Sequence, residues 1–378
     1  MHVLYLTLNP NRASTTVPTE GWFRLLRRRG LDPILVSSQS GAFQQWAREQ
    51  GVPTYDVPLP FPNIRNPLPF GKALAALRRI GRRHEVDLIH SNEHDVYPIA
   101  QYAARLLGVP KVASVHFTMD PGFCDWAFGG RRQPDRLFFV SRSSLEVCRP
   151  ALDGVVPERR WHVLRNGLDL DEFRPDPERR AETRARYGVG DRLAIGVACA
   201  LRPRKQLEHF FRAAAQLDAP IRVIVAGGPV PGDEAYAEQL LADGRALLGE
   251  RLQVLGHLDE LRGFYNALDL FVNTSQEEAC SISVIESLAC GCPVVGYASR
   301  SVDEQILPNG GEIVSQDDVQ ALTDALQRWL SDRDRLRAAR LGARQQATTL
   351  FDIRTLAEDL FAQYTEVMAE RGAPALAR

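Results

Sequence analysis

Residues 270–295 read LFVNTSQEEACSISVIESLACGCPVV and contain the elements of one β–α–β unit. The apolar run Leu270–Thr274 is short and does not alternate strictly with polar residues, which is typical of a strand buried on both faces. A helix is expected to begin near Ser281 or Ser283 and to end at Gly291. The next apolar run, Pro293–Ala298, predicts a second strand, and a connecting helix of this length makes the two strands parallel.

The same alternation of short apolar runs and longer amphipathic segments extends along most of the chain. One such segment, Gln206–Leu217, has its apolar residues on one helical face. Repeated strand–helix units predict parallel sheets covered by helices on both faces, so the predicted fold class is α/β with doubly wound, Rossmann-like sheets. The other predicted strands are Val3–Leu8, Ile34–Ser37, Asp87–His90, Lys111–His116, Arg136–Ser141, Leu193–Leu201, Arg222–Gly227 and Leu252–Leu255.

Two domains are predicted, because 378 residues exceed the usual size of one hydrophobic core. The strand–helix rhythm breaks over residues 166–192, where an Asn-Gly turn is followed by a polar segment with two prolines. The predicted divisions are residues 1–168, residues 169–350 and a C-terminal amphipathic helix within residues 351–378. Two such domains facing each other would place a cleft between the carboxyl ends of their strands, where ligands bind.

Composition excludes several classes of protein. A net charge of -1 argues against a nucleic-acid binder. The charge is uneven, since residues 1–190 carry 27 Lys and Arg against 20 Asp and Glu. The six cysteines form no Cys-x-x-Cys pair and are expected to be free thiols. With no predicted leader and no apolar run of about 18–20 residues, the chain is expected to be cytoplasmic.

A run of cations, Arg202-Pro203-Arg204-Lys205, follows one predicted strand and precedes the helix that begins near Gln206. A helix N-terminus carries a partial positive charge of about half a unit, so additional cations there are unfavourable. A bound anion would relieve this repulsion. The alternative is a solvated basic loop, and the run by itself does not distinguish the two.

The glutamates Glu278 and Glu286 also allow two interpretations. Glu278 lies in the loop after a strand, and Glu286 lies in the first turns of the next helix. Ser283-x-x-Glu286 has the spacing of a capping box, in which Glu286 would be a structural cap. A ligand-binding role fits the same positions, and spacing alone leaves both open.

This segment resembles the signature of family 4 glycosyltransferases, in which two glutamates with seven residues between them, here Glu278 and Glu286, precede a small-residue Gly-x-Pro-Val-Val stretch, here Gly291–Val295. Other segments, in the family's order, are similar to its domain joint, its donor-phosphate loop and the approach to its glutamate pair. These segments are Arg165–Phe173, Leu201–Lys205, Gly256-His257 and Phe264–Val272. Joint occurrence in order across most of residues 85–330 is far more specific than any single motif.

The resemblance implies the GT-B fold of two facing Rossmann-like domains, with the last helix returning to the first domain. It implies transfer of a sugar from a nucleoside-diphosphate sugar with retention of configuration. Lys205 and a nearby arginine would bind the diphosphate, Glu286 the ribose, and Glu278 the donor sugar, while His116 matches the family's histidine near the reaction centre. The expected catalytic residues are His116, Lys205 and Glu278, and the expected donor-binding residues are Arg202, Arg204, Lys205, Glu278, Ser281, Ile282 and Glu286.

No cofactor and no metal are expected, because Arg204 and Lys205 could supply the positive charge that a divalent ion provides elsewhere. The chain also departs from the family pattern. Ala200 stands where an arginine is usual, so either Arg202 or Arg204 would replace that cation. Ala279-Cys280-Ser281 replaces Gly-Phe-Gly, and residues 9–21 contain one glycine instead of a glycine-rich loop.

Two alternatives to a glycosyltransferase remain at this point, a sugar-nucleotide epimerase of similar fold and a non-catalytic nucleotide-sugar-binding protein. A dehydrogenase is disfavoured, since the only glycine-rich candidate, Gly227–Gly232, contains prolines in place of a helix start. The acceptor and the nucleotide base stay unassigned. Basic amphipathic segments around Arg24–Arg29 and over Lys72–Arg83 would suit peripheral contact with an anionic membrane, and a solvated helix face is the alternative.

Overall fold

The computed structural model describes residues 1–11 and 15–372 and divides the chain into two compact units. The first unit comprises Met1–Gly167 together with the segment that begins at Ile353. The second unit comprises Leu168–Asp352. These divisions lie within two residues of the predicted ones, and the final helix belongs to the first unit, as the family resemblance implies.

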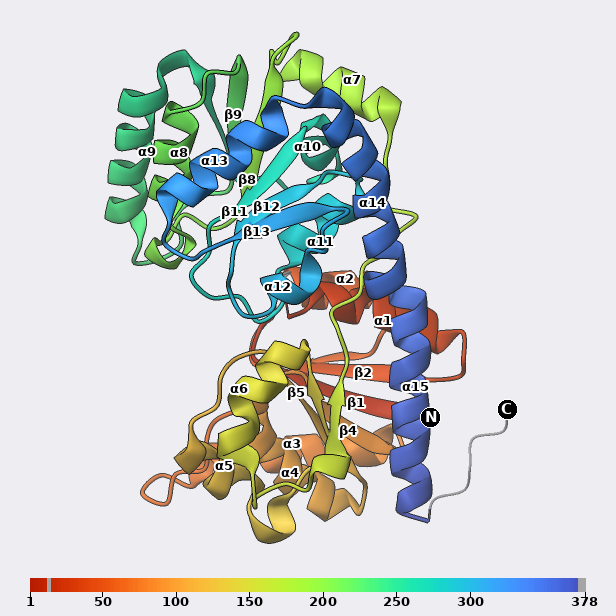
Figure 1. Ribbon diagram of the computed structural model, residues 1–378. Coiled ribbons are helices and arrows are strands. Elements are labelled where there is room, and N and C mark those ends of the chain that lie inside the picture. Colours follow the sequence, from red (N-terminus) through yellow and green to blue (C-terminus); the bar gives the residue numbers. More distant parts are fainter. Residues whose placement is uncertain (12–14, 373–378) are drawn as a thin grey trace. The chain divides into compact units, whose positions relative to one another are not determined.

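The first unit is built on a seven-stranded parallel sheet of order β3-β2-β1-β4-β5-β6-β7 (Figure 1). The order runs in opposite directions from β1, so β1 and β4 flank the topological switch point. Its strands are β1 His2–Thr7, β2 Asp32–Ser37, β3 Thr54–Asp56, β4 Leu88–Ser91, β5 Lys111–Val115, β6 Arg136–Phe139 and β7 Trp161–Val163.

Helices cover both faces of this sheet. One face packs against α1, α2 and α15, with Trp22, Phe43 and Leu360 in its core. The other face packs against α3, α4, α5 and α6. The helices are α1 Val17–Arg27, α2 Ala42–Glu49, α3 Leu68–Arg83, α4 Tyr97–Leu107, α5 Pro121–Phe128, α6 Arg142–Leu152 and α15 Ile353–Glu370, with 3₁₀ turns at His94–Val96, Gly130–Arg132 and Glu158–Arg160.

The second unit has a six-stranded parallel sheet of order β10-β9-β8-β11-β12-β13, whose switch point lies between β8 and β11. The strands are β8 Leu193–Ala198, β9 Ile221–Ala226, β10 Leu252–Gly256, β11 Leu270–Asn273, β12 Val294–Tyr297 and β13 Gly311–Val314. The helices are α7 Pro177–Arg186, α8 Leu207–Ala215, α9 Glu234–Leu248, α10 Arg262–Ala267, α11 Ile282–Ala289, α12 Val302–Gln305, α13 Val319–Leu330 and α14 Arg333–Phe351, with 3₁₀ turns at Pro203–Lys205 and Gly249–Arg251.

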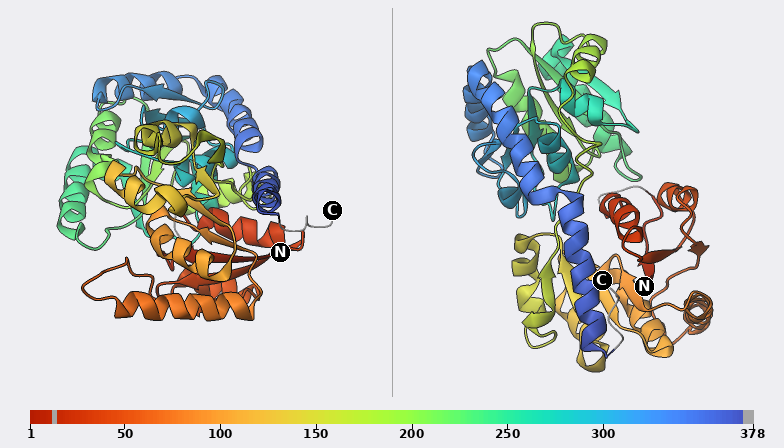
Figure 2. Two further views of the ribbon diagram at one scale, coloured as in Figure 1. Left: turned by 90° about the horizontal axis from the view of Figure 1, so that it is seen from below. Right: turned by 90° about the vertical axis from the view of Figure 1, so that its right-hand side faces the viewer.

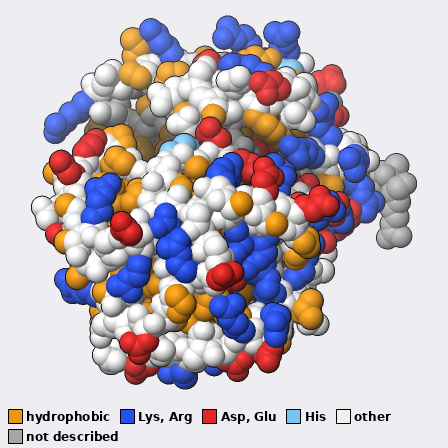
Figure 3. Space-filling model, turned by 90° about the horizontal axis from the view of Figure 1, so that it is seen from above, with side chains coloured by type: hydrophobic (Ala, Val, Ile, Leu, Met, Phe, Trp, Pro, Cys, Tyr) orange, Lys and Arg blue, Asp and Glu red, His pale blue; other side chains and the backbone are white. Residues whose placement is uncertain are grey.

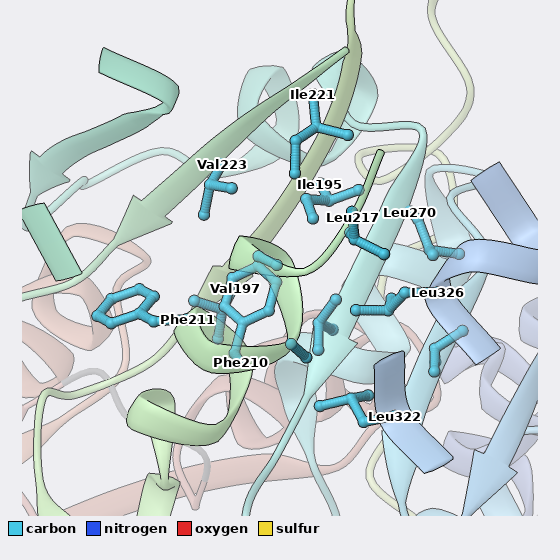
Figure 4. Packing of buried hydrophobic residues seen from close by; sticks show 14 of the residues in the cluster. Ile195, Val197, Phe210, Phe211, Leu217, Ile221, Val223, Leu270, Leu322 and Leu326 are labelled. Atoms are coloured by element: carbon cyan, nitrogen blue, oxygen red, sulfur yellow. The ribbon is translucent and has the colours of Figure 1, made fainter. Parts of the chain in front are cut away.

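The larger core cluster of the second unit lies between its sheet and the helices α8, α9 and α13. Phe210 of α8 lies over Val197 of the sheet, and Leu326 of α13 lies on the side of Leu217 and Leu270 (Figure 4). The opposite face carries α10 and α11, where Tyr265 packs edge-on against Phe271. The prediction of an α/β fold with two doubly wound sheets is therefore confirmed (Figure 2).

Among the described residues, no helix combines the length and the apolar character needed to cross a membrane. The six cysteines are free thiols, and all but Cys199 are buried.

Candidate active site

The loops that follow β8 and β11 lie side by side, because these two strands are neighbours at the switch point of the second sheet. The Thr274 hydroxyl donates to the Lys205 carbonyl at 2.8 Å, and the Gln276 N–H donates to the Arg204 carbonyl at 2.9 Å. These bonds join the predicted phosphate loop to the loop that carries Glu278.

The end of β8 is held by a close backbone approach at Gly227. This glycine has φ +132°, and a Cβ there would lie 1.8 Å from the Cys199 carbonyl oxygen. Only glycine fits such a position. The Leu201 N–H donates to the Gly228 carbonyl at 2.9 Å, so the β9 connection supports the chain just before the cationic run.

The three cations of residues 202–205 form a 3₁₀ turn that leads into α8, and each has a partner within the protein. Lys205 Nζ donates to Glu278 Oε1, and the two side chains are only 13% and 11% exposed. Arg202 Nε lies 3.2 Å from Asp233 Oδ2, and Arg204 donates to the Glu277 carbonyl at 3.3 Å. The alternative of a solvated basic loop is wrong for Lys205, whose charge is offset by the Glu278 carboxylate.

Glu286 is not a helix cap. The helix α11 begins at Ile282 with Ser281 as its N-cap residue, so Glu286 is the fifth helical residue, beyond the capping-box position. Its Oε2 accepts a hydrogen bond of 2.7 Å from the Tyr265 hydroxyl. Burial and this neighbouring carboxylate raise the pKa of Tyr265 well above its usual range. The capping interpretation of Glu286 is therefore wrong, and the ligand-binding interpretation is the one that fits its buried position.

The segment that departs from the family pattern is anchored by Gln305. The Ser281 N–H donates to Gln305 Oε1 at 3.0 Å, and Gln305 Nε2 returns a bond of 3.0 Å to the Ser281 carbonyl. Ser281 itself is buried, whereas Ile282 at the start of α11 is partly exposed. The Glu278 carbonyl accepts a bond of 3.0 Å from the Ser301 hydroxyl. Side chains thus fix a backbone that lacks the usual glycines.

His116 lies in the first unit, directly after β5, and is 5% exposed. Its Nε2 has no hydrogen-bond partner among the described residues, so its bond to the Asn92 backbone uses Nδ1. Burial lowers the pKa of His116 to about 4, so the ring is neutral at pH 7. With Nδ1 donating to a carbonyl, Nε2 carries a lone pair that can accept a hydrogen bond from a hydroxyl group.

The sequence run His90, Glu93, His94 and Asp95 could suggest a metal site, and neither Glu93 nor His94 was assigned a role in sugar transfer. Glu93 accepts bonds from the Thr7 hydroxyl at 2.7 Å and the Leu8 N–H at 3.1 Å, across the switch point of the first sheet. Burial raises the pKa of Glu93 to about 7. His94 is also buried, and its Nδ1 lacks a partner among the described residues. In the sequence, the feature that could have indicated a functional role for these residues is the polar run that follows a predicted buried strand.

A metal site in this run is not supported. His90 instead bonds to the Tyr364 hydroxyl at 2.5 Å and to the Ser114 hydroxyl at 2.8 Å. Over residues 1–11 and 15–372, no three His, Cys, Asp or Glu side chains gather as metal ligands. Residues 12–14 of the glycine-poor segment 9–21 lie outside the described residues.

Two parallel Rossmann-like sheets, with a lysine–glutamate pair at the switch point of the second, are the architecture of a GT-B glycosyltransferase. The sequence matches two family models, "Glycosyl transferases group 1" over residues 180–346 and "Glycosyltransferase Family 4" over residues 22–172. The chain belongs to glycosyltransferase family 4 and is an enzyme that uses a nucleotide sugar.

Named relatives agree with this assignment. The chain is 32% identical to a D-inositol 3-phosphate glycosyltransferase of Catenulispora acidiphila over 290 residues, which cover 70% of this chain and 68% of the relative. It is 30% identical to a GDP-mannose-dependent α-(1-6)-phosphatidylinositol monomannoside mannosyltransferase of Mycobacterium tuberculosis, covering 75% of this chain and 77% of the relative. These relatives give no support to the epimerase or non-catalytic alternatives.

Solved structures show the same fold. Anabaena HepE in complex with UDP-glucose aligns with a TM-score of 0.84 and 20% identity, covering 97% of this chain and 100% of HepE. At this identity the likeness establishes the fold alone.

Proposed function

We propose that the chain transfers a sugar from a nucleoside-diphosphate sugar to a hydroxyl acceptor with retention of configuration. The observation that carries this proposal is the contact of Lys205 with Glu278 at the switch point of the second sheet. In the proposed complex Lys205 and Arg204 hold the diphosphate, Glu286 the ribose hydroxyls and Glu278 the donor sugar. Ser281 and Ile282 lie at the start of α11 beside this sugar.

The chemistry follows from the charges. Breaking the bond between sugar and phosphate builds negative charge on the diphosphate and positive character on the sugar. Cations that are fixed in advance stabilise this change without reorganisation. Arg204 is the better substitute for the arginine missing at Ala200, because Arg202 pairs with the Asp233 carboxylate whereas Arg204 donates to the neutral Glu277 carbonyl. In this scheme the two cations replace a divalent metal.

GDP-mannose is the donor we propose, because the mycobacterial relatives are named as GDP-mannose-dependent enzymes. A carboxylate at Glu286 suits a pair of ribose hydroxyls whatever the base, so it does not select guanine. The donor sugar and the base therefore need separate tests.

Calorimetric titration with GDP, UDP, ADP and TDP tests the donor site. Selective binding of GDP is expected in the wild type, with affinity lost in Glu286→Ala and reduced at least tenfold in Lys205→Ala. Glu277→Ala is the matched control, because Glu277 is 54% exposed and pairs with Arg300. Unchanged affinity in Glu286→Ala would overturn the ribose assignment, and selective UDP binding would overturn GDP-mannose. Addition of a chelator is expected to leave turnover unchanged.

Peripheral contact with an anionic membrane at its cytoplasmic face is the second part of the proposal, and it concerns α3. Of the arginines in and just after α1, Arg29 pairs with Glu358, Arg24 lies 5.5 Å over the Trp46 ring and Arg27 donates to the Gln50 carbonyl, so these three are engaged within the first unit. The cations of α3 are exposed. Binding of the protein to sedimented anionic vesicles, and its absence with zwitterionic vesicles, tests this contact.

No role in nucleic-acid binding is proposed. The overall charge is -1, and basic and acidic side chains intermingle over the face shown in Figure 3.

A further inference from the structure

A cavity of about 870 Å³ lies in the first unit between α3 and the connection that precedes it. Tyr55 and Asp56 of β3 form one wall, and the helix forms the other. Figure 2 shows α3 in orange at the edge of the unit, with the preceding connection looping past its beginning. The cavity is separate from the donor site, which belongs to the second unit.

The walls of the cavity are largely hydrocarbon because of the residues that α3 turns toward it. Ala73 and Ala76 are small and leave space, while Leu68 and Ile80 supply apolar surface above and below them. The connection contains four prolines within residues 58–67, which restrict its backbone. A pocket of this size and lining suits an apolar ligand.

Cations line one side of the same pocket. Lys72, Arg79 and Arg83 lie on one face of α3, at intervals of seven and four residues, and all three are exposed. No ion pair of these cations occurs in the part of the chain that the structure describes. The single lining carboxylate, Asp56, is paired outside the pocket with Arg48 at 3.6 Å and also accepts hydrogen bonds from Ser40 at 2.9 Å and Gln44 at 2.6 Å. The uncompensated charge of the pocket is therefore positive.

Apolar side chains extend this surface outward along the connection. Phe61 is 48% exposed, Ile64 is 99% exposed and Leu68 is 62% exposed. An isolated exposed apolar residue needs no explanation. Of these three, Leu68 lines the cavity, while Phe61 and Ile64 belong to the connection and add exposed apolar surface just before the helix that carries the cations.

We infer that this pocket binds the hydrocarbon chain of an anionic membrane lipid, with the lipid phosphate at Lys72, Arg79 and Arg83. The apolar walls exclude a purely polar ligand such as free phosphate, and the cations select an anionic over a zwitterionic head group. The inference rests on the proposed membrane contact for the source of the lipid, and not on the donor site.

Calorimetry with the full chain and dodecyl phosphate below its critical micelle concentration tests the pocket. One molecule per chain is expected to bind, with dodecylphosphocholine about tenfold weaker and inorganic phosphate not binding detectably. Ala76→Trp, which fills the cavity, should reduce the affinity for dodecyl phosphate at least tenfold, and Ala76→Leu should give a smaller loss. Arg79→Glu/Arg83→Glu should also reduce it about tenfold.

The matched control is Arg78→Glu/Arg82→Glu, which makes the same charge change on residues of α3 that do not line the cavity. An equal loss of affinity for dodecyl phosphate in both double variants would mean general charge attraction and would overturn the inference. Unchanged affinity in Ala76→Trp would overturn it as well. Affinity for GDP, measured on every variant, reports the donor site and the fold separately. Failure of the pocket therefore leaves the donor proposal standing, and failure of GDP binding in the wild type leaves the pocket standing.

Discussion

The carboxyl edges of the two sheets carry different kinds of polar chemistry. In the second unit the edge is charged, and Lys205 and Glu278 compensate each other with little exposure. In the first unit the edge is neutral and buried, with lone pairs or N–H groups of His94 and His116 left unpartnered among the described residues. Burial moves the pKa of His116 down to about 4 and that of Glu93 up to about 7, both toward the uncharged form.

This difference matches the two halves of a transfer reaction. A diphosphate donor is an anion, and a charged edge can exchange an internal partner for it at modest cost, because ion pairs replace ion pairs. A sugar hydroxyl is neutral, and an edge of neutral hydrogen-bonding groups can bind it without burying net charge. The contrast is open to four tests, of decreasing expected effect.

Acidification from about pH 7 to pH 4 is expected to destabilise the first unit by on the order of 3 kcal/mol, and the second much less. Burial lowers the pKa of His90 to about 3 and that of His116 to about 4, whereas both titrate near 6.5 when unfolded. Their neutral rings therefore contribute stability above about pH 6.5, and it is lost as pH falls toward 4. Glu93 acts in the opposite direction and offsets about one histidine, since its raised pKa makes the folded state take up a proton first.

In the second unit the pKa values of Asp269 and Glu312 are lowered, so their contribution is lost only below about pH 4. Hydrogen exchange of peptides from each unit, measured against urea concentration at several pH values, gives the stability of each unit separately. Glu93→Gln should increase the stability that the first unit loses on acidification, and His116→Asn should decrease that loss. Equal loss in both units between pH 6.5 and 4 would contradict the contrast.

Glu278→Gln is expected to lower turnover about 100-fold, whereas Glu277→Gln should leave it near the wild-type value. Both changes remove one charge from the same loop, but Glu278 is 11% exposed against Lys205 and Glu277 is 54% exposed against Arg300. Release of sugar from GDP-mannose, or from the donor that calorimetry selects, measures the effect. Similar losses in both variants would mean that loop charge, and not the Glu278 side chain, matters.

Much of the fold could be predicted from the sequence, and the omissions have a common cause. All ten predicted strands are present, but β3, β7 and β13 were missed. Each of these lies at an edge of its sheet. An edge strand is paired on one side only, so short and partly polar segments such as Thr54–Asp56 suffice there and lack the apolar run by which buried strands are recognised.

The candidate site was predictable in its residues and not in its pairing. Lys205 and Glu278 are 73 residues apart, and motif order placed both near the donor without indicating that they contact each other. Glu286 allowed a capping interpretation until the helix start was known, since a difference of two residues decides between the two roles. Glu93 and His94 escaped assignment because their importance comes from burial, which sequence position alone does not reveal.

Lys205→Ala is expected to destabilise the second unit by about 2 kcal/mol, because it leaves the Glu278 carboxylate buried without a partner. Lys205→Ala/Glu278→Ala should restore most of that stability, while turnover stays low in both. Urea unfolding of each variant provides the measurement. If the double variant is no more stable than the single one, the two charges do not compensate each other, and the description of the charged edge is wrong.

Asp233→Asn should have the smallest effect and should act in the favourable direction. Arg202 is 39% exposed and lies 3.2 Å from Asp233, so this ion pair is worth less than about 1 kcal/mol. Removing the carboxylate frees Arg202 for the diphosphate and should tighten GDP binding about two- to threefold, an advantage that high salt abolishes. Asp243→Asn in α9, the helix that begins directly after Asp233, makes the same change in net charge away from Arg202, since Asp243 bonds to Gln239. Tighter GDP binding in Asp233→Asn alone would mean that the Asp233 carboxylate keeps Arg202 from the diphosphate. Equally tighter binding in both variants would mean that only the change in net charge matters.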